Sequence, residues 1–584
     1  MVVRKDHRKN IILRLEEDID EPKVELSLSA IKRIRFILIL IIISFLTVVF
    51  KMISVATSTN DSSTISLKID KVRGKIYDRN GSILAVNLPT KSIYVRPDEV
   101  FDLENTAKAL VEVIDEKNDK LYEIVLSKLK SPKPFVWIKR HILPSQQLKI
   151  RSLGLQGVYL ADDSKRFYPQ ENDFSHLIGF VDIDQNGISG IEKSFNEVLS
   201  EGNDIKLSLD INIQSIVRNK LSNAILNHEA LGGMAVIMDV NNGEIVSLVS
   251  LPDFNPNGQK VTSNKDEEMF NRATLGLYEM GSTFKILTLA IGLDMGAVKL
   301  SDSFNVSQPI KLGKYLINDY KFHKANLTLP EVLIFSSNRG VGQVGIKIGI
   351  EKQQEYLRNI GMLSPIDLEI GERGRPLHVS PKQWNEVYLV TISYGHGIAV
   401  TALHTVQAIA SVTNGGILYK PTILKQTLQP EGVRVFKEKT SHTMRKLMRR
   451  VVEEGYAKKA EVEGYNIGGK TGTAEKVKNG KYVKHNCNLA SFFGAFPIDN
   501  PQYVIFVAVD EPKPNKLNQG FTTGGWVAAP LAADIENLIR EKIYSPNYIY
   551  CPHKLKVLLY VTYHIFSIQL DLFYYLTLLK KIMR

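Results

Sequence analysis

The longest apolar stretch of the chain lies near its start. The run FILILIIISFLTVVF occupies residues 36–50, and after Lys51 the apolar segment continues to Ala56. About 20 apolar residues suffice for a helix to cross a bilayer, and a lysine near a helix end extends its amine to the interface. We therefore predict one transmembrane helix over residues 36–56.

The charges on either side of this run predict its orientation. Basic residues precede it closely, whereas the first charge after Lys51 is Asp61. The basic residues are Lys32, Arg33 and Arg35. Positively charged flanks stay in the cytoplasm, so residues 1–35 are predicted to be a cytoplasmic tail of a single-pass inner-membrane protein whose remainder faces the periplasmic side. A cleaved signal peptide is the alternative, but the polar leader is long for one.

Residues 57–205 mix short apolar and polar segments. The segment VRGKIYDRNGSILA, residues 72–85, is centred on Asn80-Gly81, a dipeptide typical of β-hairpin turns. No cluster of candidate catalytic side chains falls here. We predict a mixed pedestal domain of the dimerisation type over residues 57–205.

The second half of the chain has the pattern of a layered domain. Two apolar strands within residues 232–257 meet at Asn242-Gly243, another hairpin signal, and residues 282–296 have helical periodicity. Two more buried strands are predicted over residues 489–499 and 503–512. Strands at both ends of a helical middle predict an α/β fold of the α+β type, with helices packed on an antiparallel sheet.

This domain is predicted to span residues 206–545. The remaining segment, residues 546–584, is an apolar and aromatic-rich tail. Gln569 and Asp571 stand in its middle, which argues against a second membrane span. A position on the membrane surface and a position capping the domain both stay open, and we assign the tail no role.

Composition narrows the class of partner. The chain is 44% hydrophobic and 23% charged, with a formal net charge of +12 that is spread along its length. A dispersed positive charge fits a protein close to a membrane and wall better than a nucleic-acid reader.

The two cysteines, Cys487 and Cys551, make no disulfide framework, and whether they pair is not readable from sequence. The histidines lack metal-ligand spacing, so no metal or cofactor is expected.

The sharpest candidate for chemistry is the tetrapeptide Ser282-Thr283-Phe284-Lys285. Residues three apart on a helix share one face, so the lysine amine is expected beside the serine hydroxyl. An amine that burial or nearby cations keep neutral can take the proton of a serine nucleophile. The spacing alone is weak, since it recurs at Ser29–Lys32 and Ser127–Lys130. A helix N-cap serine beside a solvated lysine is the plain alternative.

Two later motifs strengthen the case for Ser282 as a nucleophile. Ser336-Ser337-Asn338 follows in a region of helical pattern, and Lys470-Thr471-Gly472-Thr473 follows in a segment suited to a strand. With these motifs in this order, the sequence resembles a class B penicillin-binding protein, most similar to the septal enzyme of cell division. Further matching segments are RGKIYDRNG (73–81), GISGIE (187–192), YGHGIAVT (394–401), TNGG (413–416) and GYNIGGKTGTAEK (464–476).

The resemblance implies a serine penicillin-recognising transpeptidase domain and a role for each motif residue. Ser282 would attack the bond between the terminal D-alanines of a stem peptide, and Lys285 would be the base. Ser336 would relay a proton, Asn338 would hold Lys285 and the peptide amide, and Lys470 would supply positive charge near Ser336. Thr471, Gly472 and Thr473 would form the substrate-binding strand, with the backbone N–H groups of Ser282 and Thr473 as the oxyanion hole.

The resemblance also implies partners. These are peptidoglycan stem peptides and lipid-linked wall precursors, β-lactams, the membrane, and, because no glycosyltransferase domain is recognised, a membrane glycosyltransferase with division-complex proteins. No cofactor and no nucleic acid are implied. One departure from the family concerns Met280, where the family usually has proline, which would pre-set the turn into the helix.

Three alternatives remain open at this point. An elongation-specific transpeptidase or a D,D-carboxypeptidase would use the same serine, and a non-catalytic divisome scaffold would use none of the motifs. Residues 464–471, GYNIGGKT, also satisfy the phosphate-loop pattern. That motif needs a strand before it and a helix after it, whereas the flanking sequence here predicts a helix and turn before it and a hairpin after it.

Overall fold

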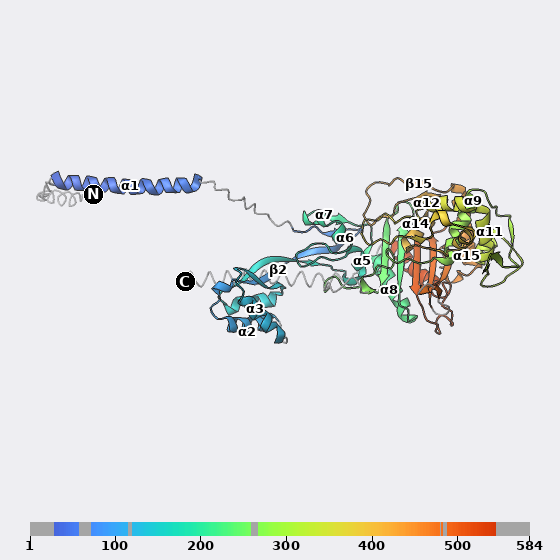
Figure 1. Cartoon of the computed structure of the whole chain (residues 1–584), viewed down its shortest axis with the longest axis horizontal. Coiled ribbons are helices and arrows are strands. Elements are labelled where there is room, and N and C mark those ends of the chain that lie inside the picture. Colours follow the sequence, from blue (N-terminus) through green and yellow to red (C-terminus); the bar gives the residue numbers. More distant parts are fainter. Residues whose placement is uncertain are drawn as a thin grey trace, which may run out of the picture. The chain divides into compact units, whose positions relative to one another are not determined.

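The computed structural model (Figure 1) describes residues 28–57, 72–114, 119–258, 267–478, 481–482 and 487–544. It divides into two units, Met1–Asp70 and Lys71–Arg584. The apolar tail at 546–584 and Cys551 lie outside the described residues, so the predictions about them remain predictions.

The described part of the first unit is one helix, α1 (Leu28–Thr57). Its window Arg35–Met52 is long and apolar enough to cross a membrane and is fully exposed. Nothing else among the described residues passes the same test. The helix begins at Leu28, eight residues before the predicted span. The preceding residues Leu28–Arg35 contain no helix breaker, so the helix extends through them.

The pedestal is built on a five-stranded sheet in the order β3-β2-β1-β5, with β4 paired to β2. The strands are β1 (Ile76–Tyr77), β2 (Ile83–Val95), β3 (Val136–Ile142), β4 (Val158–Phe167) and β5 (Ile205–Lys206). β1 and β2 form the hairpin predicted at Asn80-Gly81, where Gly81 has φ +88°. The helices of this domain are α2 (Leu103–Ile114), α3 (Asp119–Leu129), α4 (Pro144–Leu153), α5 (Ser175–Ile178), α6 (Gly190–Ser194) and α7 (Asn196–Ser200).

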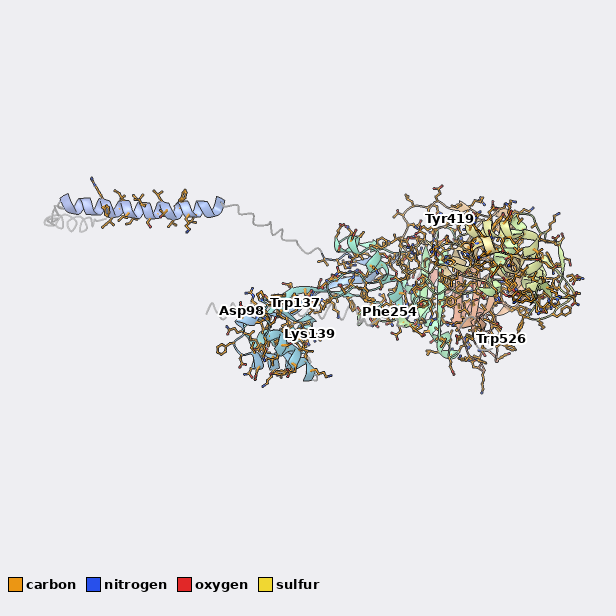
Figure 2. The ribbon with its side chains drawn as sticks, in the orientation of Figure 1. Asp98, Trp137, Lys139, Phe254, Tyr419 and Trp526 are labelled. Atoms are coloured by element: carbon orange, nitrogen blue, oxygen red, sulfur yellow. The ribbon has the colours of Figure 1, made fainter. Side chains whose placement is uncertain are left out.

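Side chains at the end of the long strand β2 point alternately to its two faces. Ile93 and Val95 enter a small core under the helices. Tyr94 lies on the opposite face, where its ring stacks on Tyr159 of β4 at 5.4 Å and meets the edge of Trp137 of β3 at 6.0 Å. Trp137 is labelled in Figure 2.

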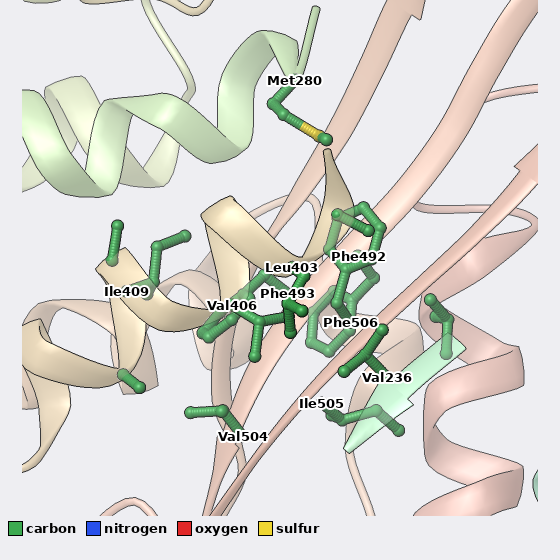
Figure 3. Packing of buried hydrophobic residues seen from close by; sticks show 14 of the residues in the cluster. Val236, Met280, Leu403, Val406, Ile409, Phe492, Phe493, Val504, Ile505 and Phe506 are labelled. Atoms are coloured by element: carbon green, nitrogen blue, oxygen red, sulfur yellow. The ribbon is translucent and has the colours of Figure 1, made fainter. Parts of the chain in front are cut away.

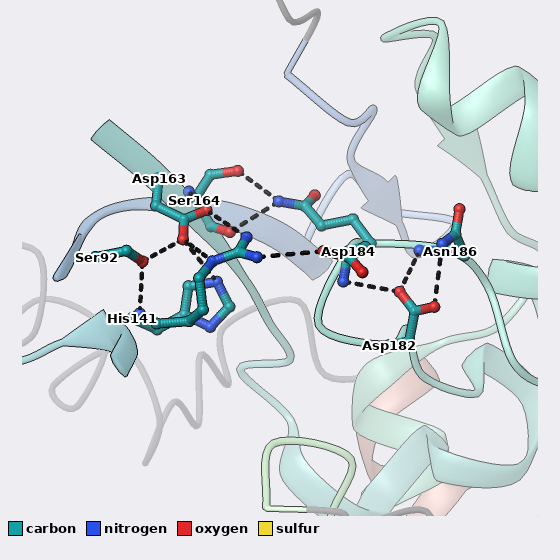
Figure 4. Close-up of polar contacts among 9 residues, drawn as sticks. Ser92, His141, Asp163, Ser164, Asp182, Asp184 and Asn186 are labelled. Atoms are coloured by element: carbon teal, nitrogen blue, oxygen red, sulfur yellow. Dashed lines mark hydrogen bonds and ion pairs between the residues drawn. The ribbon is translucent and has the colours of Figure 1, made fainter. Parts of the chain in front are cut away.

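Polar side chains connect the pedestal strands to the loop that follows α5 (Figure 4). Arg140 on β3 donates from Nε to Asp163 Oδ2 on β4 at 2.5 Å and reaches Asp184 in the loop at 3.2 Å. Ser92 on β2 donates to the same Asp163. The loop itself is closed by Asp182, which accepts from the backbone N–H of Asn186 at 2.8 Å. Strands β2, β3 and β4 and the loop are therefore joined by one hydrogen-bond network.

A buried ionic group joins the segment before β1 to strand β4 and helix α6 in the pedestal. Glu192 on α6 is fully buried and accepts from Arg73 Nε at 2.8 Å and from Arg166 Nε at 2.7 Å. Both arginines have further acceptors, among them the Glu192 and Gly74 carbonyl oxygens at 2.9 and 2.8 Å. Such a group is stable only while each charge keeps its partners.

The RGKIYDRNG segment also contacts the larger domain. Arg79 donates to Glu244 Oε2 at 3.0 Å, and Glu244, which is fully buried, also accepts from Lys425 Nζ at 2.9 Å. Asn80 Nδ2 donates to Asp210 Oδ2 at 2.9 Å. The hairpin turn is thus bonded to Asp210 and Glu244, both residues of the larger domain.

The centre of the larger domain is a five-stranded antiparallel sheet in the order β16-β19-β20-β6-β7. Its strands are β6 (Gly232–Asp239), β7 (Ile245–Leu251), β16 (Gly468–Glu475), β19 (Asn488–Phe496) and β20 (Tyr503–Asp510). The predicted strands and the predicted antiparallel sheet, built from both ends of the domain, are confirmed. β16 is an edge strand, so one side of its backbone is open to another partner.

Helices cover the sheet in two groups. α8 (Ile211–Asn227) and α16 (Ala528–Tyr544) pack on each other and on β20. α14 (Ala402–Thr413), α15 (Glu438–Glu454) and α9 (Lys285–Asp294) form the other group, with α14 against β6, β19 and β20. Leu403 and Val406 of α14 meet Phe493 and Phe506 of the sheet in the main core, which Met280 also joins (Figure 3).

Shorter elements complete the domain. The helices are α10 (Leu329–Ile334), α11 (Asn338–Ile348), α12 (Ile350–Asn359) and α13 (Glu386–Ser393). The paired strands are β8 (Ser303–Asn305) with β11 (Asn326–Thr328), β9 (Ile310–Leu312) with β10 (Tyr315–Ile317), β12 (Leu377–His378) with β13 (Ile398–Ala399), β14 (Ile417–Leu418) with β15 (Val433–Arg434), and β17 (Val477–Lys478) with β18 (Lys481–Tyr482).

Replacing Glu192 by alanine tests the buried ionic group. We expect Glu192→Ala to lower the free energy of unfolding by about 3–5 kcal/mol, because two buried guanidinium groups lose their counter-charge. Urea unfolding of the detergent-solubilised protein, followed by tryptophan fluorescence, measures the change. Glu454→Ala is the matched control: Glu454 pairs with Arg450 on an exposed helix face at 2.8 Å, and its loss should cost below about 1 kcal/mol. Equal effects of the two substitutions would contradict the interpretation.

Candidate active site

The candidate nucleophile sits on a tight helical turn. Residues Gly281–Phe284 form a 3₁₀ turn that runs directly into α9 at Lys285. The turn is held by Thr283, whose Oγ1 donates to the Met280 carbonyl oxygen at 2.9 Å. Ser282 is half-buried, whereas Lys285, one turn later, is fully buried.

The second motif lies at a corner between two helices. Sequence pattern placed Ser336 within a helical region, but α10 ends at Ile334 and α11 begins at Asn338. Ser336 has φ +56°, a left-handed conformation that no helix interior accepts. Ser337 caps α11, accepting from the Gly340 N–H at 2.9 Å. The corner turns the Ser336 hydroxyl toward α9.

A chain of hydrogen bonds joins the two motifs. The hydroxyl groups of Ser336 and Ser282 are 3.0 Å apart, and Lys285 Nζ lies 3.1 Å from Ser336 Oγ. Lys285 Nζ also donates to the Ser336 carbonyl oxygen at 2.5 Å and to Asn338 Oδ1 at 2.7 Å. Sequence spacing predicts direct contact between Lys285 and Ser282. In the described contacts Lys285 reaches the nucleophile through Ser336.

The third motif lies on the edge strand β16, as its sequence suggested. Lys470 is 1% exposed and donates to the Thr471 carbonyl oxygen at 3.1 Å, whereas Thr473 is exposed. Thr473 Oγ1 accepts from the Gly524 N–H at 3.0 Å, which ties the strand to the segment before α16. The phosphate-loop alternative is wrong, because its Gly-Lys-Thr falls inside a strand and not at a helix N-terminus.

Glycines allow the strand to approach the nucleophile turn. A Cβ on Gly472 would lie 2.4 Å from Ser491 Oγ and 3.0 Å from the Met280 carbonyl oxygen. A Cβ on Gly281, which has φ +55°, would lie 3.3 Å from the Thr473 carbonyl oxygen. The backbones of the first and third motifs are therefore in near contact, with Ser282 at the open edge of β16.

The two buried lysines repel each other. Burial lowers the pKa of Lys285 well below its ordinary value, the positive charge of Lys470 lowers it further, and the Asp319 carboxylate opposes both effects. Burial also lowers the pKa of Lys470 to about 7. A lower lysine pKa raises the neutral fraction of the amine at neutral pH, and the neutral amine is the state that accepts a proton.

Sequence reasoning missed His396, which was taken for a surface or satisfied core histidine. The Gly397 N–H donates to Glu279 Oε1 at 2.8 Å, and the Gly281 N–H donates to the Gly395 carbonyl oxygen at 3.2 Å, so the YGHG segment wraps around the nucleophile turn. Burial lowers the pKa of His396, and the positive charge of Lys285 contributes. Spacing in the sequence does not link positions 282 and 396, so the signal for His396 was its place in the family-like segment 394–401.

The other histidines noted in the sequence have structural partners. His404 bonds to Thr401 in the capping box of α14 and to the Ser364 carbonyl oxygen at 2.9 Å. His378 contacts the Val379 carbonyl oxygen at 2.9 Å, and His323 contacts Tyr456 Oη at 2.9 Å. Over the part of the chain that the structure describes, no group of three or more metal-ligating side chains is present.

Gly472→Ala tests the close approach of β16 to the nucleophile turn. We expect a loss of about 1–3 kcal/mol in stability, since the added methyl group presses on the Met280 carbonyl, and a slower reaction at Ser282 as the two backbones separate. Thermal unfolding and the rate of labelling by a fluorescent penicillin measure the two effects. Gly371→Ala is the control, because its Cβ would meet nothing within 4 Å. Unchanged labelling in Gly472→Ala would contradict the assignment.

Comparison with known proteins follows the same division of the chain. A family model described as the penicillin binding protein transpeptidase domain matches residues 233–536, and one described as the penicillin-binding protein dimerisation domain matches residues 68–207.

Individual relatives match along most of their length. The probable peptidoglycan D,D-transpeptidase FtsI of Caulobacter vibrioides is 36% identical over 482 residues, which are 80% of each chain. Stage V sporulation protein D of Bacillus subtilis is 33% identical over 564 residues, 88% of this chain and 85% of that protein. The crystal structure of a peptidoglycan synthetase from Bifidobacterium adolescentis matches with a TM-score of 0.65 at 23% identity, over 82% of this chain and 96% of that one. This likeness confirms the predicted fold class.

Proposed function

Because the chain belongs to the penicillin-binding protein transpeptidase family, we propose that it is a peptidoglycan D,D-transpeptidase that forms its acyl-enzyme on Ser282. The observation that carries the proposal is the hydrogen-bond chain from Ser282 through Ser336 to the buried amine of Lys285. A solvated lysine would be protonated at neutral pH and would take no proton from either serine.

Counting donors gives the direction of proton movement. A neutral lysine amine has two N–H groups and one lone pair, and two short contacts of Lys285 are to pure acceptors, the Ser336 carbonyl and Asn338 Oδ1. The lone pair is then left for the Ser336 hydroxyl. Ser336 can donate to Lys285 and accept from Ser282, since hydroxyl hydrogens rotate to suit their partners. The proton of Ser282 therefore passes through Ser336 to Lys285.

Acylation follows from this arrangement. Ser282 Oγ attacks the carbonyl carbon between the terminal D-alanines, and backbone N–H groups of Ser282 and Thr473 bind the negative oxygen that develops. When the C–N bond breaks, the proton held by Lys285 returns through Ser336 to the departing D-alanine nitrogen. In transfer, an acceptor amine attacks the acyl carbon and passes a proton through Ser336 to Lys285. The new C–N bond forms, the ester C–O bond breaks, and the same proton returns to Ser282 Oγ.

The open edge of β16 suits an extended peptide. Added alongside Thr471–Thr473, a stem peptide would gain backbone hydrogen bonds as an additional strand. Its carboxylate would meet the hydroxyl groups of Thr471 and Thr473, near the positive charge that Lys470 carries when protonated. β-Lactams would enter the same position and acylate the same serine.

We place this chemistry outside the cytoplasmic membrane. The support is the exposed apolar helix α1 with basic residues before it and no comparable cluster after it. The substrates proposed are stem peptides of lipid-linked wall precursors, and a membrane glycosyltransferase and division-complex proteins are the proposed partners.

The proposed setting is septal wall synthesis during cell division. Its support is the short pedestal and the 36% identity to a protein named FtsI. The likeness to Stage V sporulation protein D favours a sporulation-specific wall as the second candidate. The elongation-specific alternative differs from both in its place of action, because such an enzyme would cross-link the side wall.

Ser282→Ala tests the nucleophile. Membranes carrying the protein, incubated with a fluorescent penicillin and separated on a denaturing gel, should show a labelled band that Ser282→Ala abolishes, because no other group forms the ester. Ser127→Ala is the matched control: Ser127 begins a Ser-x-x-Lys tetrapeptide too, but lies exposed on α3. A folded wild-type protein without label would contradict the proposal and favour a scaffold. The products formed from a stem-peptide donor would separate the two activities. A transpeptidase gives cross-linked peptides, whereas a carboxypeptidase gives peptides that have only lost the terminal D-alanine.

Depletion in the host tests the setting. Cells deprived of the protein should lose incorporation of a fluorescent D-amino acid at midcell and grow as filaments, because the septal wall is no longer cross-linked. Complementation with Ser127→Ala should restore division, and complementation with Ser282→Ala should not. Rounded cells with labelled septa would point to side-wall growth, and normal division with defective spores to the sporulation role.

A further inference from the structure

A dipeptide that no catalytic motif includes holds the Ser336 corner. Asn318 and Asp319 follow strand β10 directly. The Asp319 carboxylate accepts from Ser337 Oγ at 2.7 Å and from the Arg339 N–H at 2.9 Å. The Asn318 carbonyl oxygen accepts from Asn338 Nδ2 at 3.1 Å. Three consecutive residues, 337 to 339, are thus bonded to two consecutive residues of another segment.

These bonds decide how Asn338 faces Lys285. A side-chain amide has a donor end and an acceptor end. Because Nδ2 is engaged by the Asn318 carbonyl, Oδ1 is directed to Lys285 Nζ, 2.7 Å away. Reversing the amide would place two donors together at Lys285 and two acceptors together at Asn318. The contact with Asn318 therefore fixes the acceptor that orients the lysine amine.

The bonds to Asp319 act on the backbone beside Ser336. A left-handed non-glycine residue costs about 1 kcal/mol or more, and it persists only where its surroundings hold it. Asp319 holds the residue that follows Ser336 and the first turn of α11. The position of the Ser336 hydroxyl, which joins Ser282 to Lys285, depends on this anchor.

The segment with Asp319 is itself fixed farther along. His323 stacks on Phe335 with ring centroids 4.2 Å apart, and its Nε2 contacts Tyr456 Oη at 2.9 Å. Lys324 pairs with Glu331 on α10 at 2.6 Å. The loop that carries Asp319 is therefore also bonded to α10 and to Tyr456.

We propose that Asp319 is a positioning residue of the active site: with Asn318 it holds the Ser336–Asn338 corner against Lys285, and its carboxylate is the negative charge that acts on the Lys285 amine. The inference rests on the proposed function of Ser282. The charged or titratable groups that influence Lys285 or respond to it are Lys470 from β16, His396 from the YGHG segment and Asp319.

Geometry and charge are separable by substitution. In Asp319→Asn, Oδ1 still accepts from the Arg339 N–H, and the amide donates to Ser337 Oγ, whose hydroxyl hydrogen rotates away. That variant keeps the anchor and loses the charge. Asp319→Ala loses both. Since Asp319 raises the pKa of Lys285, removing its charge lowers that pKa, and the amine then stays neutral down to a lower pH.

The experiment measures the second-order rate constant for acylation by a fluorescent penicillin against pH, with the full-length protein in membranes. Asp319→Asn should move the acidic limb of the profile to lower pH and keep most of the plateau rate. Asp319→Ala should lower the plateau about 100-fold, because a displaced Ser336 breaks the proton path. Asp302→Asn is the matched control: it removes a half-buried charge that pairs with Lys347 at 3.3 Å, and its profile should equal wild type.

Each outcome has one meaning. An unshifted acidic limb in Asp319→Asn, or a plateau in Asp319→Ala within about threefold of wild type, overturns the inference, since a misplaced group should cost far more. If Asp319→Ala fails to fold, the limb of Asp319→Asn decides alone. A wild-type protein that takes no label contradicts the proposed function and not the role of Asp319, so the two failures are distinguishable.

Discussion

Two buried lysine amines, those of Lys285 and Lys470, are the constraint around which the catalytic domain is arranged. Moving an ammonium group out of water costs several kcal/mol, and a second one nearby adds repulsion. The cost is avoided when the group gives up its proton. Lys285 lies at the start of a helix packed into the main core, and Lys470 lies on a strand of the same core. Packing thus supplies the dry surroundings that lower the pKa of both amines, as the proposed role of Lys285 as a base requires.

The pedestal meets the same constraint in the opposite way. Arg73, Arg166 and Glu192 are buried together, and each charge has oppositely charged or carbonyl partners within about hydrogen-bond distance. Guanidinium groups do not deprotonate in proteins, so that group must remain charged and paired. Buried charge therefore produces rigidity in one domain and chemistry in the other. The two domains differ because the pedestal buries arginines next to a carboxylate, whereas the larger domain buries lysines, which can lose their proton.

Local patterns were enough for the sequence to predict the strands, the Asn80-Gly81 and Asn242-Gly243 hairpins, and the three motifs. Each depends on residues close together in the chain. The sequence did not predict the left-handed Ser336, the route from Lys285 through that hydroxyl, or the contributions of Asp319 and His396. These depend on contacts between segments 18 to more than 100 residues apart, which no periodicity or spacing records. Helix α1 was predicted by composition, but its first turns lie outside the apolar run and were missed.

Met280 shows how packing can replace a covalent restraint. Proline at this position would fix φ near −65°, and Met280 already has φ −82° without it. Three contacts hold the turn instead. Thr283 Oγ1 donates to the Met280 carbonyl, the Gly281 N–H donates to Gly395, and the methionine side chain, 1% exposed, fills the core beside the sheet. The direction of the Ser282 hydroxyl is therefore set by the core itself.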